Sequence, residues 1–214
     1  MCAWGALPEG TANVLAYELR QPRSSLAAAR ALAGAEVRTI DVGMAGEIPF
    51  LMMASGGIDA AVMAQQSSVM KRLFGVAAVG AKGLRVFLSY DSPMMELRVG
   101  GDTVRAAFFS ACNIPFFGGP VRLAPEAEPR DGILDLVLLE TPGRWALAKF
   151  FLAVLLGRHL ERPDVRYLRV RELEILGPLP FGLQVDGDVL PVPLPCRVTV
   201  RREALRVLVP PHRS

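Results

Sequence analysis

A loop that could bind a cation lies in the middle of the chain. Residues 123–137 read Leu-Ala-Pro-Glu-Ala-Glu-Pro-Arg-Asp-Gly-Ile-Leu-Asp-Leu-Val. Pro125 and Pro129 fix the backbone and remove two N–H donors, so we expect residues 124–130 to form an ordered loop rather than a helix. Asp131-Gly132 then supplies a turn before a buried strand. Unpaired carbonyls beside a carboxylate suit a hard cation, although an ordinary turn is the simpler interpretation.

Two further turns place polar groups where a ligand could bind. Gly10-Thr11-Ala12-Asn13 precedes a helix at residues 14–20, and the free amides at a helix N-terminus bind anions. A plain capped helix is the commoner use of such a turn. Asp59 follows Gly56-Gly57 at a strand-to-helix corner. It is either an N-cap or a contact to the polar head group of a ligand.

The elements that position these turns are mostly short strands, because 17 prolines and 20 glycines favour a turn-rich fold. Asp186-Gly187 is a good hairpin turn, and Gly100-Gly101-Asp102 predicts a second hairpin. Hydrophobic periodicity predicts helices at 14–20, 26–32, 60–69 and 143–156, with one or two more within 71–87. It predicts strands at 36–42, 50–55, 94–99, 103–112, 133–139, 166–176, 183–185, 189–192, 196–202 and 205–209.

The composition excludes several classes of protein. The chain has 214 residues, 51% of them hydrophobic and 21% charged, so it can bury a core. Its net charge of +3 comes from scattered arginines, which argues against a nucleic-acid partner. Three isolated cysteines and two histidines fit neither a disulfide framework nor a zinc site, and they indicate a reducing cytosol. We find no signal peptide, and Trp145–Leu156 is too short to span a bilayer, so core packing is its expected role.

Four motifs stand in one order: Gly10-Thr11-Ala12-Asn13, Ser55-Gly56-Gly57-Ile58-Asp59-Ala60, the segment from Asn113 to Asp135, and Asp186-Gly187-Asp188. Together they resemble the diacylglycerol kinase and sphingosine kinase family, especially its bacterial soluble lipid kinases. The resemblance implies an α+β fold. A remnant of an α/β nucleotide-binding domain at 1–40 would precede a β-rich, sandwich-like domain at 41–214. The last strand, about 203–210, would pack back on the first domain.

The same resemblance assigns roles to individual residues. It implies ATP-dependent phosphorylation of a lipid hydroxyl, with Mg²⁺ as cofactor and ATP as co-substrate. Asp188 occupies the place of a general base, and Asp59 that of a residue near the lipid head group. Gly10, Thr11 and Asn13 match a nucleotide-contacting motif. The metal site would combine the Asp131 carboxylate with the backbone carbonyls of Glu128 and Ile133.

The chain departs from the family at several points. The Gly-Gly-Asp-Gly-Thr loop that cradles the ATP phosphates is absent, Arg130 stands where a second aspartate is common, and Asp188 replaces a glutamate. We therefore expect a truncated lipid kinase acting on diacylglycerol or a sphingoid-like lipid. The alternative is a non-catalytic lipid-binding or regulatory module. The expected location is the cytoplasm, with peripheral contact at the inner membrane face. A lipid substrate and a second copy of the chain are the partners to consider.

Overall fold

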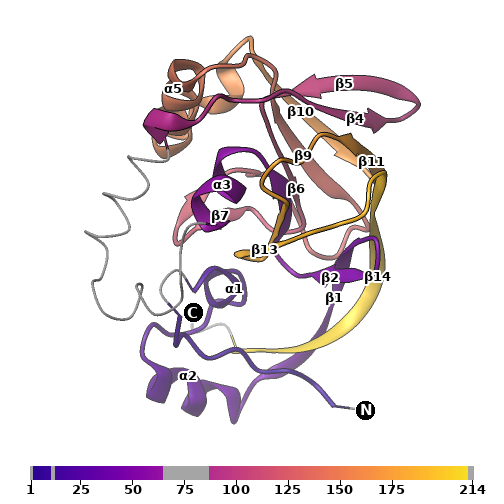
Figure 1. Ribbon diagram of the computed structural model, residues 1–214. Helices are drawn as coiled ribbons and strands as arrows, with labels where there is room; N and C mark the ends of the chain where they lie inside the picture. The colour runs from indigo at the N-terminus through magenta and orange to yellow at the C-terminus, as the bar shows by residue number, and fades with distance from the viewer. Residues whose placement is uncertain (1, 11–12, 65–86, 212–214) are drawn as a thin grey trace.

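Two antiparallel sheets and a layer of helices make up the molecule, as the computed structural model shows (Figure 1). The structure describes residues 2–10, 13–64 and 87–211. Sheet A orders its strands as β2 (Ile48–Phe50), β1 (Glu36–Ala45), β14 (Cys196–Val209), β11 (Glu172–Gly177), β4 (Met95–Val99) and β5 (Asp102–Ala106). Sheet B orders them as β10 (Val165–Val170), β9 (Leu134–Leu139), β6 (Phe108–Cys112), β3 (Met53–Gly56), β12 (Leu183–Val185) and β13 (Asp188–Leu190).

The helices are spread from one end of the molecule to the other (Figure 1). A small hairpin of β7 (Phe116–Gly118) and β8 (Val121–Arg122) stands apart from the two large sheets. The helices are α1 (Val14–Glu18), α2 (Ser25–Leu32), α3 (Ile58–Ala64) and α5 (Arg144–Leu155), followed by a 3-10 turn, η1 (His159–Glu161). No helix within the described ranges has the length and apolar content needed to cross a membrane.

The main core lies between the two sheets, and a second core lies between sheet B and the helices. Strand β9 shows how the sequence builds both. Leu134, Leu136 and Leu138 point into the core between the sheets, whereas Val137 and Leu139 face α3 and α5. Successive side chains of a strand alternate between its two faces, so an unbroken apolar run suits a strand buried on both sides. The predicted β-rich, sandwich-like fold is therefore confirmed.

Three predicted strands were wrong in the same way, because the chain crosses from one sheet to the other within them. Residues 103–112 divide at Ala107 into β5 of sheet A and β6 of sheet B. Residues 166–176 divide at Arg171 into β10 and β11, and residues 50–55 divide into the end of β2 and β3. Conversely, the two strands predicted for 196–202 and 205–209 form the single strand β14.

The first residues of the chain pack against the far end of β14. Trp4 makes a parallel bridge to Val207, and its carbonyl accepts a hydrogen bond from Leu208 N–H at 2.8 Å. Leu19 and Val207 share a third, small core with Ile40. The domain division at 40/41 stays a prediction; in the structure β1 runs through that position. The helices predicted within 65–86 lie outside the described residues.

Candidate functional site

The acidic hairpin of β12 and β13 lies at the free edge of sheet B. Asp186 and Gly187 close it with φ angles of 50° and 99°, the positive values that a two-residue type I′ turn requires. The half-buried carboxylate of Asp186 accepts hydrogen bonds from three successive backbone N–H groups, at residues 51, 52 and 53, over 2.7, 2.9 and 3.0 Å. Asp186 therefore anchors the hairpin, while Asp188 stays exposed on the edge strand.

Asp59 is buried at the start of α3, directly after the Gly56-Gly57 turn. One carboxylate oxygen accepts a hydrogen bond from Ala60 N–H at 2.8 Å, and the other contacts the Ser55 hydroxyl. Burial raises the pKa of Asp59 to about 6, against the lowering effect of these two hydrogen bonds. Because α3 packs against β12 and β13, the carboxyl group of Asp59 lies beside the acidic hairpin.

The surroundings of Asp59 form a buried polar cluster. The Ser55 hydroxyl, which contacts Asp59, also lies 2.8 Å from Gln184 Oε1. A serine hydroxyl has one proton, so it can donate to Gln184 and accept from Asp59 when Asp59 carries a proton. The buried hydroxyl of Tyr90 has no hydrogen-bond partner in the described part of the chain. Burial, and secondarily the charge of Asp59, raises the pKa of Tyr90.

Both glycines of the turn before Asp59 are needed for close packing. A Cβ at Gly56 would lie 2.5 Å from the ring of Phe109. Gly57 has a φ of +127°, and a Cβ there would lie 3.0 Å from the Ala107 carbonyl oxygen. The turn thus presses the start of α3 onto β6, and it fixes the position of Asp59.

The predicted cation-binding loop has the expected conformation. Residues 124–130 form turns without a helix, and Gly132 has a φ of +73°. The Asp131 carboxylate accepts a hydrogen bond from Ile133 N–H at 3.0 Å and forms an ion pair with Arg169 of β10. The carbonyl of Glu128 accepts the N–H of Arg130 at 2.7 Å. An arginine therefore supplies the positive charge that this carboxylate requires.

Asp135 offers a second carboxylate near Asp131. It is fully buried, and one oxygen accepts a hydrogen bond from the Tyr167 hydroxyl at 2.7 Å. Its other oxygen, Oδ2, has no partner in the described residues. Burial raises the pKa of Asp135, whereas Tyr167 and Arg169 lower it. Carboxylate and carbonyl oxygens of this kind fit a hard cation, provided that Arg169 releases Asp131.

No cluster of three or more His, Cys, Asp or Glu side chains with metal-binding geometry occurs among the residues that the structure describes. A magnesium ion at this loop would therefore depend on backbone carbonyls and water for most of its ligands. The donors proposed from the resemblance, at Glu128, Asp131 and Ile133, are of that type.

A hydrogen-bonded network joins this loop to the acidic hairpin, and the sequence analysis missed it. Asp41 is fully buried in a bulge of β1, and its carboxylate accepts Gly132 N–H and Glu203 N–H, each at 2.7 Å. The Asn113 amide donates to the carbonyl of Asp41 at 3.1 Å and to that of Leu51 at 2.9 Å. Leu51 N–H in turn donates to Asp186. The Asn113–Asp135 segment and the Asp186-Gly187-Asp188 hairpin are thus linked through Asp41 and Asn113.

The predicted nucleotide residues lie at the start of α1. Asn13 is the N-cap residue, with a left-handed φ of 48°, and its side-chain oxygen accepts Gly10 N–H at 2.7 Å. The side chain thus closes the turn rather than capping the helix. Thr11 lies outside the described residues. Of the other predicted residues, Asp59 lies on α3, which packs against the strand β13 that carries Asp188. Asp131 lies in the loop that the Asp41 and Asn113 hydrogen bonds join to the acidic hairpin.

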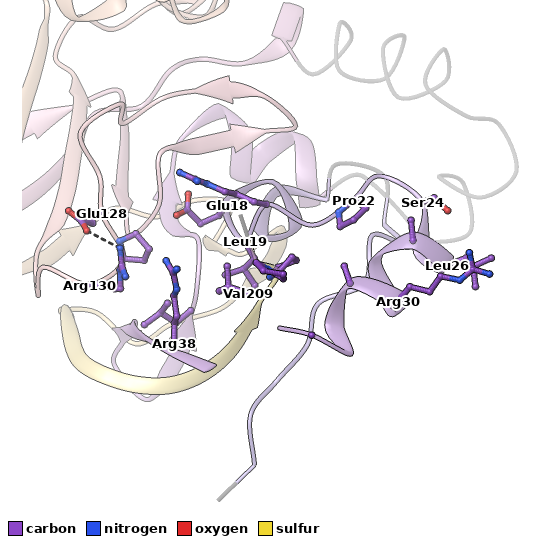
Figure 2. Close-up of a pocket in the computed structure, with 18 of the residues that line it drawn as sticks. Glu18, Leu19, Pro22, Ser24, Leu26, Arg30, Arg38, Glu128, Arg130 and Val209 are labelled. Atoms are coloured by element: carbon purple, nitrogen blue, oxygen red, sulfur yellow. Dashed lines mark hydrogen bonds and ion pairs between the residues drawn. The ribbon is translucent and has the colours of Figure 1, made fainter. Parts of the chain in front are cut away.

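A hollow of about 1130 Å³ lies between the N-terminal helices and the 127–130 loop, so Glu128 of the predicted metal site lines it (Figure 2). Figure 2 shows Arg38 and Arg130 on one side of it and Arg30 on α2 on the other. Burial in its wall raises the pKa of Glu18, while nearby arginines lower it. Neither Asp59 nor Asp188 lines this hollow, so its volume does not mark the acidic site.

The sequence matches a family model described as the YegS C-terminal NAD kinase beta sandwich-like domain, over residues 52–209. The chain is 33% identical over 207 residues to a YegS-like probable lipid kinase of Pseudomonas fluorescens, covering 95% of this chain and 68% of that protein. It is 36% identical over 138 residues to a YegS-like probable lipid kinase of Pseudomonas putida, covering 64% of this chain and 46% of that protein.

More distant relatives agree with this match. The chain is 25% identical over 187 residues to a diacylglycerol kinase of Bacillus subtilis, covering 86% of this chain and 62% of that protein. Its fold is similar to the crystal structure of a diacylglycerol kinase from Bacillus anthracis, with a TM-score of 0.72 and 17% identity, over 96% of this chain and 68% of the other. This chain thus spans roughly half to two thirds of the length of the relatives it matches.

Proposed function

Because this chain belongs to the family of YegS-like lipid kinases and diacylglycerol kinases, we propose that it forms the lipid-binding side of an enzyme that phosphorylates a lipid hydroxyl. The observation that carries the proposal is the position of Asp59 beside the hairpin that holds Asp188. The proposed substrate is diacylglycerol or a sphingoid-like lipid. The proposed place of action is the cytoplasmic face of a membrane, where a lipid hydroxyl and ATP can meet.

In this proposal Asp188 acts as the general base. It is an exposed carboxylate on an edge strand, so a lipid hydroxyl can approach it from solvent. A carboxylate within hydrogen-bond reach takes the hydroxyl proton as the oxygen attacks the γ-phosphorus and the bond to the β-phosphate breaks. Asp186 holds the hairpin through three backbone hydrogen bonds, so it is a positioning residue for Asp188.

Asp59 receives a different role, since its carboxyl group is buried. With a pKa of about 6, it can accept a hydrogen bond from a lipid head group when ionised or donate one when protonated. The Ser55 hydroxyl, which also contacts Gln184, holds one carboxyl oxygen in place, and the glycines before α3 keep the helix against β6. We assign Asp59 to binding and orientation of the head group.

Magnesium supplies charge neutralisation for phosphoryl transfer when it is bound. We propose that the Asp131 carboxylate and the carbonyls of Glu128 and Ile133 hold such an ion at the loop, with Arg169 as its competitor. Gly10, Thr11 and Asn13 remain the proposed contacts to the nucleotide. The 214 residues contain no Gly-Gly-Asp-Gly-Thr segment, so the main phosphate-binding loop is proposed to come from residues outside this sequence.

The same missing segment favours a second candidate, a non-catalytic lipid-binding or regulatory module. A module of this kind would retain the acidic hairpin and the Asp59 cluster without transferring phosphate. The reading frame upstream of Met1 distinguishes the two candidates. A Gly-Gly-Asp-Gly-Thr segment in frame supports the kinase, whereas a stop codon supports the module.

The decisive experiment measures ATP-dependent phosphorylation of diacylglycerol by the protein extended through its upstream reading frame. The Asp188→Asn variant should lower kcat by about a hundredfold or more, the usual loss when a general base is removed. Asp102→Asn is the matched control, because Asp102 is also an exposed aspartate beside a hairpin turn, but in sheet A. Equal activities in the two variants would refute the role of Asp188.

A further inference from the structure

Helix α5 has apolar side chains on both of its sides. Leu147, Phe150 and Val154 are buried in the core shared with sheet B. The opposite side exposes Trp145 by 72% and Leu152 by 58%, and Leu155 and Leu156 are exposed as well. Residues 145, 149, 152 and 156 follow the helical repeat, so they share one face. Core packing, the role expected from the sequence, explains only the buried side.

The charged side chains within the segment from Gly143 to His159 are all basic. Between Gly143 and His159 the sequence contains Arg144, Lys149 and Arg158 and no aspartate or glutamate. Arg158 pairs with Glu161, and Arg144 donates a hydrogen bond to the carbonyl of Leu88 at 3.2 Å. Lys149 lies on the exposed face itself, between Trp145 and Leu152. Exposed tryptophan and leucine beside basic residues are typical of helices that lie in a membrane interface.

The apolar surface extends beyond α5. Leu88, whose carbonyl holds Arg144, is itself 58% exposed, so a second segment contributes to the surface. Exposed apolar groups that are contiguous mark interaction sites more often than single exposed residues do. In Figure 1, α5 lies at the end of the molecule opposite α1 and α2.

This face is placed suitably for lipid chemistry. Helices α3 and α5 contribute to one hydrophobic core on the same side of sheet B, through Ile58 and Ala61 of α3 and Phe150 of α5. Asp59 lies in the first turn of α3. A membrane that contacts α5 would therefore lie on the side of sheet B that carries Asp59.

We propose that the exposed face of α5, formed by Trp145, Lys149, Leu152, Leu155 and Leu156, docks the protein on an anionic lipid bilayer. Trp145 and the leucines enter the interface, and Lys149 extends its charged end to the lipid phosphates. Only the link to catalysis rests on the proposed function, since docking itself requires neither ATP nor a kinase substrate.

A second copy of the chain fits this face less well than a bilayer. In a two-fold symmetric dimer the same patch meets itself, so both Lys149 ammonium groups would enter one apolar interface. Within the described part of the chain no acidic side chain on α5 could compensate them. Anionic head groups supply that compensation at a bilayer surface.

Vesicle binding by the 214-residue chain tests the proposal. The probe is a vesicle of phosphatidylglycerol and phosphatidylcholine, compared with pure phosphatidylcholine, and neither contains diacylglycerol. We expect at least tenfold tighter binding to the anionic vesicles, and a tenfold or larger loss in Leu152→Glu. Leu26→Glu is the matched control, because Leu26 is 62% exposed on α2 at the other end of the molecule. It should bind like the wild type.

Tryptophan fluorescence gives a second readout. The chain has two tryptophans, so Trp4→Phe leaves Trp145 as the only one. Its emission should shift to shorter wavelength when anionic vesicles are added, and the Leu152→Glu substitution should abolish the shift. Circular dichroism of each variant verifies that the fold is kept.

Three results would overturn the proposal: no binding to anionic vesicles, equal losses in Leu152→Glu and Leu26→Glu, or a dimer in solution that Leu152→Glu dissociates. The last would assign the face to a second copy. An extended protein that binds vesicles normally but transfers no phosphate would refute the proposed kinase activity and leave docking intact.

Discussion

Replacing Asp41 should destabilise the protein strongly, although this residue lies outside every motif recognised in the sequence. Its buried carboxylate accepts two backbone N–H groups, those of Gly132 and Glu203, each at 2.7 Å. A hydrogen bond to a charged acceptor contributes about 1.5–3 kcal/mol, and removing the acceptor leaves the donor unsatisfied. We therefore expect Asp41→Ala to lower the free energy of unfolding by about 3–5 kcal/mol. Domains of this kind have about 5–15 kcal/mol in total.

Two further variants make this measurement specific. Asp41→Asn keeps one acceptor oxygen and loses the charge, so it should cost about half as much as the alanine variant. Asp102→Ala removes an exposed aspartate at the start of β5 and should change stability by less than about 0.5 kcal/mol.

Urea unfolding, followed by both circular dichroism and tryptophan fluorescence, gives the free energies if the two transitions coincide. A loss below about 1 kcal/mol in Asp41→Ala would refute the reasoning, because the two N–H groups would then have other partners or access to water.

Three other outcomes are expected. The melting temperature of the wild type should rise with millimolar Mg²⁺, and Asp131→Ala should abolish this rise. Arg169→Met should enlarge the rise, because it removes the cation that competes for Asp131. Equal shifts in all three proteins would contradict the proposed metal site. Burial raises the pKa of Asp59 from 3.8 to about 6, so the unfolded chain loses this proton at lower pH than the folded chain does. The free energy of unfolding of the wild type should therefore fall by up to about 3 kcal/mol between pH 4 and pH 7. Asp59→Asn should therefore gain stability relative to the wild type as the pH rises over that range. A difference in unfolding free energy that stays the same at every pH would contradict a buried Asp59 carboxyl group with a raised pKa. The 214-residue chain alone should show no ATP-dependent transfer to diacylglycerol in a radiolabelled phosphate assay, and turnover above the no-enzyme control would show that the Gly-Gly-Asp-Gly-Thr loop is dispensable.

Local chemistry was enough to predict the elements that one segment determines by itself. The prolines at 125 and 129 prevent a helix, and the Asp186-Gly187 turn closes its hairpin as expected. Strand crossings were not predictable in this way. No glycine or proline interrupts the sequence near Ala107 or Arg171, where the chain changes sheets. Hydrophobic periodicity reports which residues are buried but not which sheet they join.

The contacts of the site that were missed join residues far apart in the sequence. Asp186 binds the backbone of residues 51–53, more than 130 positions earlier, and Asp41 binds Glu203 across 162 positions. Neither pairing leaves a local pattern. Arg169 was missed because it meets Asp131 only when β10 pairs with β9. An isolated aspartate in an apolar strand, such as Asp41, is the one signal that could have indicated a buried polar network.

The length of β14 creates a hazard that its own sequence offsets. Strand β11 pairs with β14 only as far as Thr199, and Trp4 bridges it again at Val207. Between Thr199 and Val207, within the described chain, one side of β14 has no strand neighbour. An unpaired strand edge of this kind can pair with other chains and cause aggregation. Arg201, Arg202 and Glu203 occupy that stretch and are exposed. Their charges disfavour edge-to-edge association along the uncovered part of this 14-residue strand.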